Sequence, residues 1–197
     1  MSNLSGNRKV RFIDGELVEY EVLPLVDQYN PILRTPTIPV GFEHIAGGEV
    51  AYLAMSMMES LNHHQGLGLS ANQVGLKHRM FSMSRRDINK VWCLINPEIL
   101  SISKNMVETK EGCLSFPNIF IPIKRPDWVE LGFQAVNGEF VKHKFEGIEA
   151  AVALHELDHL KGVCFTDLIS PLKLDMMKRR SKNMLRRIKR APDLVSR

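Results

Sequence analysis

The sequence GIEAAVALHELDHLK, at residues 147–161, decides most of what can be predicted about this chain. Its apolar residues recur with helical periodicity, and Gly162 follows where a helix often ends. Positions i and i+4 of a helix share one face, so His155 and His159 can present two imidazoles to one metal ion. Glu156 is placed to contact a water on that ion rather than the ion itself. The stretch therefore predicts an apolar helix that carries a catalytic metal centre.

The third protein ligand of this metal centre must come from elsewhere in the chain. Zinc peptidases with an extended HExxHxxGxxH motif take it from a downstream histidine, but Phe165 stands at that position and no histidine follows His159. We therefore expect an upstream ligand, and Cys113 in the loop-like sequence EGCLSFP is the best candidate. A thiolate suits a borderline or soft divalent ion. Three protein ligands leave a fourth position for water, as in catalytic sites.

The composition is typical of a globular protein with one core. The chain has 197 residues, of which 44% are hydrophobic and 24% charged, so bulk disorder is not expected. No uncharged apolar run approaches the roughly 18 residues of a membrane span. The first 21 residues lack the apolar stretch of a secretory signal, and three cysteines argue against a disulfide framework. We expect a cytoplasmic monomer that does not bind membranes.

Helical and strand-like patterns alternate around the motif helix. Residues 43–64 have helical spacing of apolar residues. Four β-like runs follow, at residues 79–83, 91–100, 128–136 and 139–145. The last two flank Asn137-Gly138, a strong hairpin signal. Ser170-Pro171 begins a last helix. These elements predict an α+β fold in which the HExxH helix packs against antiparallel strands, with a C-terminal basic helix.

The glycine-rich segment GLGLSANQVG, at residues 66–75, interrupts these patterns. It has no GKS or GKT sequence, so a phosphate-binding loop is rejected. Two interpretations remain: a simple turn after the preceding helix, or an edge where a peptide substrate adds as a strand. In the second, Gln73 would supply an amide donor nearby.

Three segments together resemble the motifs of the peptide deformylases, in the same order and spacing. They are GLGLSANQ at 66–73, EGCLS at 111–115 and HELDH at 155–159, and the resemblance spans about residues 20–170. It implies that water removes formate from the N-formylmethionine of a nascent chain. It also implies an ion on Cys113, His155 and His159. Members of this family typically favour Fe(II), with zinc, nickel or cobalt as substitutes.

The resemblance also implies roles for other residues. Glu156 moves protons, while the Gln73 amide and the backbone N–H of Leu114 donate hydrogen bonds to the oxyanion. Gly68 and Gly112 flank the peptide-binding groove. The family's first motif usually reads Gly-x-Gly-x-Ala-Ala-x-Gln, and here a serine, residue 70, replaces the first alanine. We expect the fold to tolerate this small change, which can alter hydration or hydrogen bonding around Gln73.

A methionine pocket is expected beside the metal. Ile148, Ala151 and Val152 form one stripe of the motif helix together with His155, at positions i, i+3, i+4 and i+7. Leu67 would form another wall. The alternative is that the stripe is ordinary core packing, and part of it must serve that purpose in any case.

Two charge patterns lead to further predictions. Asp158 lies on an otherwise apolar helix, and we expect Arg125 to pair with it and tie the cysteine segment to the helix. A solvated surface pair is the alternative.

Residues 173–190 contain nine Lys or Arg and one acid. The basic helix, residues 171–190, is expected to bind ribosomal RNA near the peptide exit. Its alternatives are a merely solvated face or a general anion- or membrane-surface binder. Its apolar stripe is Leu174, Met177, Met184, Leu185 and Ile188.

We expect three parts along the chain: an N-terminal extension at 1–20, a catalytic domain at 21–170, and a basic helix and tail at 171–197. Two other functions remain open at this point. One is a metallopeptidase that uses HELDH, which the missing downstream ligand disfavours. The other is an inactive protein that binds RNA, which the complete ligand set and Glu156 disfavour.

Overall fold

The structure is a computed structural model that describes residues 9–13, 16–41, 48–85 and 88–190. Its strands are β1 (Lys9–Ile13), β2 (Glu16–Tyr20), β3 (Gly68–Ser70), β4 (Met80–Arg85), β5 (Lys90–Ile102), β6 (Met106–Cys113), β7 (Phe116–Pro126), β8 (Trp128–Gln134) and β9 (Phe140–Glu146). Its helices are η1 (Pro31–Arg34), α2 (Glu49–His64), η2 (Ala71–Val74), α3 (Gly147–Leu160), η3 (Phe165–Leu168) and α4 (Pro171–Arg190). The predicted α+β fold is confirmed.

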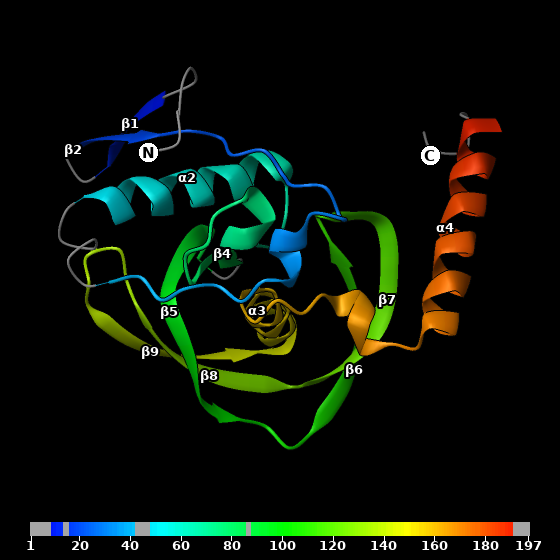
Figure 1. The fold of residues 1–197 in the computed structure, drawn as a ribbon. Coiled ribbons are helices and arrows are strands. Elements are labelled where there is room, and N and C mark those ends of the chain that lie inside the picture. The colour runs from blue at the N-terminus through cyan, green and yellow to red at the C-terminus, as the bar shows by residue number, and fades with distance from the viewer. Residues whose placement is uncertain (1–8, 14–15, 42–47, 86–87, 191–197) are drawn as a thin grey trace.

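An antiparallel sheet in the order β3-β4-β5-β8-β9 supports the helix α3, which is seen end-on near the centre of Figure 1. Buried Phe81, Leu131 and Phe145 pack from this sheet against small residues of α3, Ala150 and Ala153. Small side chains let the helix approach the strands closely. The predicted hairpin is confirmed, because β8 and β9 pair antiparallel on either side of Asn137-Gly138.

A second helix packs against this sheet, and a glycine ends α3. The helix α2 packs Val50, Met57 and Leu61 into a second core cluster with β3, β4 and β5. It begins at Glu49, and residues 43–47 of the predicted helix lie outside the described residues. Gly162 ends α3 with φ of +76°, and a Cβ there would lie 2.7 Å from the Arg34 carbonyl oxygen. Only glycine fits this position without strain.

The antiparallel pair β6–β7 forms a separate two-stranded sheet beside α3. These strands were not predicted from the sequence. Cys113, expected in a loop, is instead the last residue of β6, and Leu114 and Ser115 form the turn into β7. The described residues of the N-terminal extension form the hairpin β1–β2.

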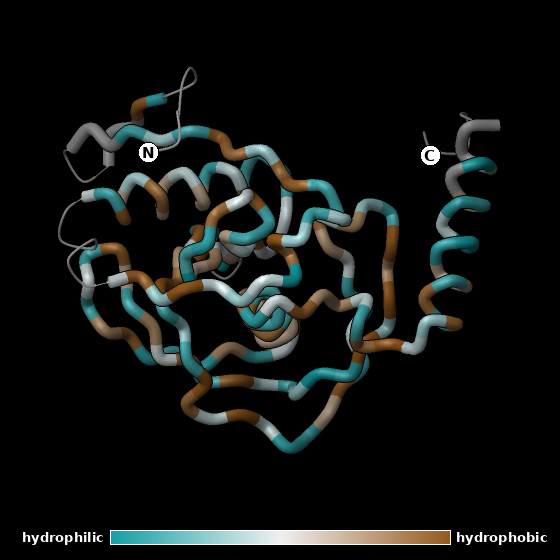
Figure 2. The backbone as a smooth tube through the Cα atoms, in the orientation of Figure 1, coloured by the Kyte–Doolittle hydropathy of each residue, from teal (hydrophilic) through white to brown (hydrophobic). Residues whose placement is uncertain are grey.

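The helix α4 contacts the rest of the protein near β7 and otherwise stands apart from it (Figure 1). Leu174 and Met177 pack against the cluster formed by β7, η1 and η3, whereas Met184 is 63% exposed. The side chains of Leu185 and Ile188 lie outside the description. Much of α4 beyond this contact is hydrophilic (Figure 2). Among the described helices, none is long and apolar enough to cross a membrane.

Candidate active site

Cys113, His155 and His159 converge at the junction of β6 and α3. One potential ligand atom from each lies within 4.8 Å of the others. Cys113 Sγ is 3.2 Å from His159 Nε2, and the two imidazole centroids are 4.9 Å apart. Both histidines are buried. One thiol and two imidazoles are a donor set that suits a borderline divalent ion, so the residues present fit a metal site.

A buried hydrogen-bond network contacts His155 through its Nδ1 atom. Its Nδ1 is 2.8 Å from Glu111 Oε2, which leaves Nε2 for an ion. Arg125 donates to both oxygens of Glu111, at 2.7 and 3.0 Å, and its Nη1 lies 2.6 Å from Asp158 Oδ2. The predicted pair of Arg125 and Asp158 is therefore confirmed. It is part of a larger arrangement that joins the strand of Cys113 to the helix of the two histidines.

The two histidines differ in their electrostatics. Burial lowers the pKa of His159 well below its usual value, and the neighbouring His155 adds to this effect. Burial also opposes the charge of His155, but Cys113 and Glu111 outweigh it and raise the pKa to about 10. Since a metal takes neutral imidazole and thiolate, binding an ion here must release protons.

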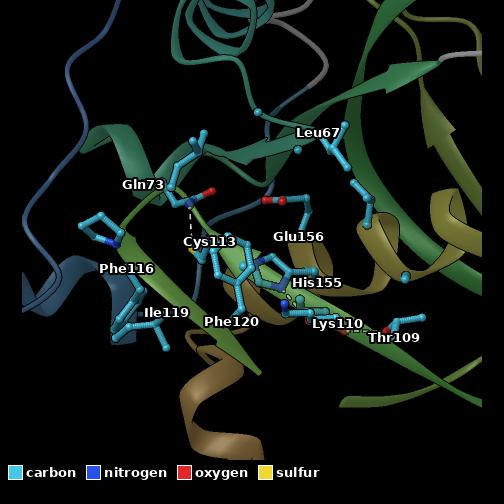
Figure 3. A pocket seen from close by; sticks show the side chains of 18 of the residues that line it. Leu67, Gln73, Thr109, Lys110, Cys113, Phe116, Ile119, Phe120, His155 and Glu156 are labelled. Atoms are coloured by element: carbon cyan, nitrogen blue, oxygen red, sulfur yellow. Dashed lines mark hydrogen bonds and ion pairs between the residues drawn. The ribbon is translucent and has the colours of Figure 1, made fainter. Parts of the chain in front are cut away.

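Glu156 and Gln73 lie beside Cys113 and His155 (Figure 3). Gln73 Nε2 is 3.3 Å from Cys113 Sγ, and its Oε1 accepts a hydrogen bond of 2.8 Å from the Ser70 backbone. Glu156 is 3% exposed, and burial raises the pKa of its carboxyl above the ordinary value. A carboxyl with a raised pKa suits proton transfer near neutral pH.

A cavity of about 460 Å³ opens onto this cluster (Figure 3). The residues predicted to bind substrate all line it, as do Gln73, Cys113, Leu114, His155 and Glu156; the substrate residues are Leu67, Gly68, Gly112, Ile148, Ala151 and Val152. Ala151 is buried and Ile148 is 55% exposed. The predicted stripe of α3 therefore includes an exposed residue, Ile148, and a buried one, Ala151.

Both groove glycines lie in close contact with a side chain that lines the cavity. A Cβ at Gly68 would lie 2.7 Å from Cδ of Glu156 and would collide with its carboxylate. A Cβ at Gly112 would lie 2.7 Å from Cε1 of the Phe120 ring. Any larger residue at either position would displace a side chain that lines the cavity.

Two residues that contribute to this site were not predicted from the sequence. Glu111 lies two residues before Cys113 on β6, so strand alternation places both side chains on the same face, and this could have been inferred had the strand been recognised. Ser70 was noted only as a departure near Gln73, whereas its hydroxyl lies 2.7 Å from Glu156 Oε2. No local pattern signals that contact, because the two residues are 86 positions apart.

An HExxH helix that meets a cysteine from an upstream strand, over an apolar cavity, defines a metal-dependent hydrolase. The family model described as polypeptide deformylase matches residues 22–175. The chain belongs to the polypeptide deformylase family. It is a metal-dependent enzyme that removes the formyl group from the N-terminal formylmethionine of polypeptides.

Relatives and solved structures agree with this assignment. A peptide deformylase of Thermotoga maritima is 42% identical over 135 residues, which cover 68% of this chain and 80% of that protein. One from Bartonella henselae is 38% identical over 162 residues, or 81% and 90% of the two chains. The actinonin-bound crystal structure of a class I type b peptide deformylase from Acinetobacter baumannii is 31% identical. It has a TM-score of 0.71 and covers 76% of this chain and 99% of its own.

Proposed function

We propose that this chain deformylates nascent N-formylmethionyl polypeptides at an ion held by Cys113, His155 and His159, with Glu156 as general acid and base. The observation that carries the proposal is the convergence of those three potential ligands beside a buried carboxyl and a cavity. The test is formate release from formyl-Met peptides, with unformylated peptides as substrates for the metallopeptidase alternative. Cleavage of internal peptide bonds without formate release would refute deformylation.

Each group has a distinct part in the reaction. The ion, when bound, supplies a Lewis acid that activates water and polarises the formyl carbonyl. Glu156 takes a proton from the attacking water and returns it to the methionine nitrogen as the C–N bond breaks, so that formate leaves. The Gln73 amide and the Leu114 N–H donate to the oxyanion, and one such donor is worth about 3 kcal/mol of barrier.

The identity of the ion is a separate proposal. We propose Fe(II), with zinc, nickel or cobalt able to substitute. One thiolate and two imidazoles are compatible with all of these ions, and geometry and availability decide among them in cells. Metal analysis of protein purified without oxygen, paired with the formate assay on the same sample, tests this. Activity that follows zinc content and not iron content would overturn the preference.

We propose that the methionine side chain enters the apolar part of the cavity. Leu67 forms one wall, and Ile148, Ala151 and Val152 form another along α3. Gly68 and Gly112 would flank the peptide backbone, which needs close approach on both sides. An unbranched thioether fits an irregular apolar pocket well. The preference is measured as the ratio of kcat/KM for formyl-Met and formyl-Ala peptides.

We propose that residues 21–170 form the catalytic domain of a monomer acting in the cytoplasm, with 1–20 as an extension and 171–197 as a docking element. The support for docking is that α4 contacts the domain through Leu174 and Met177, while basic side chains such as Lys178, Arg180 and Lys182 are exposed. Such a face supplies phosphate contacts without reading sequence. The partner would be ribosomal RNA near the peptide exit.

Charge reversal tests this docking more cleanly than truncation. A chain cut after Leu172 should keep activity on small peptides and lose salt-sensitive ribosome binding, but it also removes two core contacts. Lys178→Glu with Lys182→Glu leaves those contacts in place and should give the same loss. A reversed variant that cosediments with ribosomes as the parent does would show that α4 is not the anchor.

A further inference from the structure

Ser70 is fully buried and makes a contact that alanine cannot make. It is the last residue of β3 and the N-cap of η2, at the position where the family's first motif usually has alanine. Its hydroxyl is 2.7 Å from Glu156 Oε2 and 3.0 Å from the Glu156 carbonyl oxygen. A hydroxyl has one proton, and a carboxylate oxygen is the stronger acceptor. The shorter bond therefore marks the main contact.

No other side chain in the described residues hydrogen-bonds to the Glu156 carboxylate. On another side, Gly68 Cα packs so closely that a Cβ there would touch Cγ and Cδ of Glu156. The carboxylate is thus limited by packing against Gly68 and by one directional bond from Ser70. Figure 3 shows it pointing toward the region of Gln73 and Cys113.

Ser70 also contacts the residue proposed to bind the oxyanion. Its backbone N–H donates to Gln73 Oε1 at 2.8 Å. This bond turns the amide so that Nε2 lies 3.3 Å from Cys113 Sγ. The backbone bond does not depend on the side chain. The hydroxyl alone distinguishes this chain from one with alanine.

We propose that the Ser70 hydroxyl is a positioning residue that holds one carboxylate oxygen of Glu156, so that the other is aimed at the attacking water and the leaving nitrogen. The inference rests on the proposed role of Glu156. A glutamate side chain has several rotatable bonds, and misplacing a catalytic group by about 1 Å can cost a factor of about 100 in rate.

The test is Ser70→Ala, which removes only the hydroxyl. We expect kcat to fall about 10- to 100-fold, which corresponds to the loss of one hydrogen bond to a charged group, with KM and metal content unchanged. The matched control is Ser60→Ala, which loses a buried hydroxyl of α2 that bonds to the Leu23 N–H and the Ser56 carbonyl. It should lower the melting temperature and leave kcat unchanged. A fall in kcat caused by general destabilisation would appear in both variants.

A double-mutant cycle asks whether Ser70 acts through Glu156. In a Glu156→Ala background, adding Ser70→Ala should cause no further loss of residual activity. An equal loss in both backgrounds, or full activity of Ser70→Ala, would overturn the proposal. A crystal structure of Ser70→Ala provides a readout independent of turnover: Glu156 should occupy more than one rotamer, and an unchanged single rotamer contradicts the inference. If the parent releases no formate, the proposed function fails, while the crystal structure still decides where the carboxylate lies.

Discussion

Replacing Arg125 by Met tests the buried network behind the metal site. The Arg125 side chain is 9% exposed and makes three hydrogen bonds, two to Glu111 and one to Asp158. Methionine keeps most of the volume and the apolar stem but removes the charge. Glu111, 7% exposed, would then keep only His155 and a 3.5 Å contact from the Thr109 hydroxyl among the described residues, and Asp158 would lose its cation.

The expected loss is about 4 kcal/mol of unfolding free energy, since removing one partner of a buried ion pair costs roughly 3–5 kcal/mol. Most of it comes from Glu111, because Asp158 is 21% exposed and water screens that pair. For a chain of this size, 1 kcal/mol corresponds to a shift of about 2–4 °C. The melting temperature should therefore fall by roughly 8–16 °C.

Urea unfolding of the metal-loaded protein at pH 7 measures the loss, with Asp158→Asn as the control. The control keeps the Arg125–Glu111 pair and should cost about 1 kcal/mol or less. Metal affinity should fall about 10- to 100-fold in Arg125→Met, because Glu111 orients the ring of His155. A loss below about 1 kcal/mol, together with unchanged metal affinity, would refute the structural role assigned to the network.

Three further predictions follow from the site. Glu156→Gln should retain the ion by metal analysis but lose most formate release at neutral pH, because the amide keeps the shape and cannot accept the proton; near-full turnover would falsify the role of Glu156. Val152→Trp should raise KM for formyl-Met peptides by partly filling the cavity, provided circular dichroism shows a folded protein, and an unchanged KM counts against the pocket. Burial raises the pKa of Glu111, but His155 and Arg125 outweigh it and hold the net pKa below its usual range. Its ionisation therefore stabilises the fold above its unfolded pKa of about 4.3, and this contribution is lost as pH falls through the folded pKa. Unfolding free energies of the parent and Glu111→Gln should converge on acidification, and a gap that stays constant down to pH 3 contradicts the shift.

The parts of the fold that were predicted from sequence have local signals, and the missed strands lack them. The α3 helix has apolar periodicity and a terminal glycine, and the β8–β9 hairpin has Asn-Gly at its turn. In contrast, β6 reads MVETKEGC, with mostly polar or exposed residues, because a two-stranded sheet buries little of it. The strand β7 contains three prolines, which argue against a strand. Pro122 pairs with Lys110 in a two-stranded sheet, in which both strands are edge strands, the position where proline occurs in sheets.

The residues of the metal site also differ in whether their positions can be predicted from the local sequence. The spacing of His155 and His159 is set by one helix and can be read from five residues, whereas the position of Cys113 depends on how β6 packs beside α3. The buried network of Glu111, Arg125 and Asp158 joins these two elements. Glu111 lies on the strand of Cys113 and bonds to His155, so a rigid link of one carboxylate fixes the distance between ligands that are 42 residues apart in sequence. Against the effect of burial, His155 and Arg125 from β7 lower the pKa of that carboxyl, and Asp158 from α3 pairs with Arg125. Because these bonds involve only protein groups, the ligands are brought together by the fold itself, and the ion binds to a site whose ordering cost has largely been met during folding.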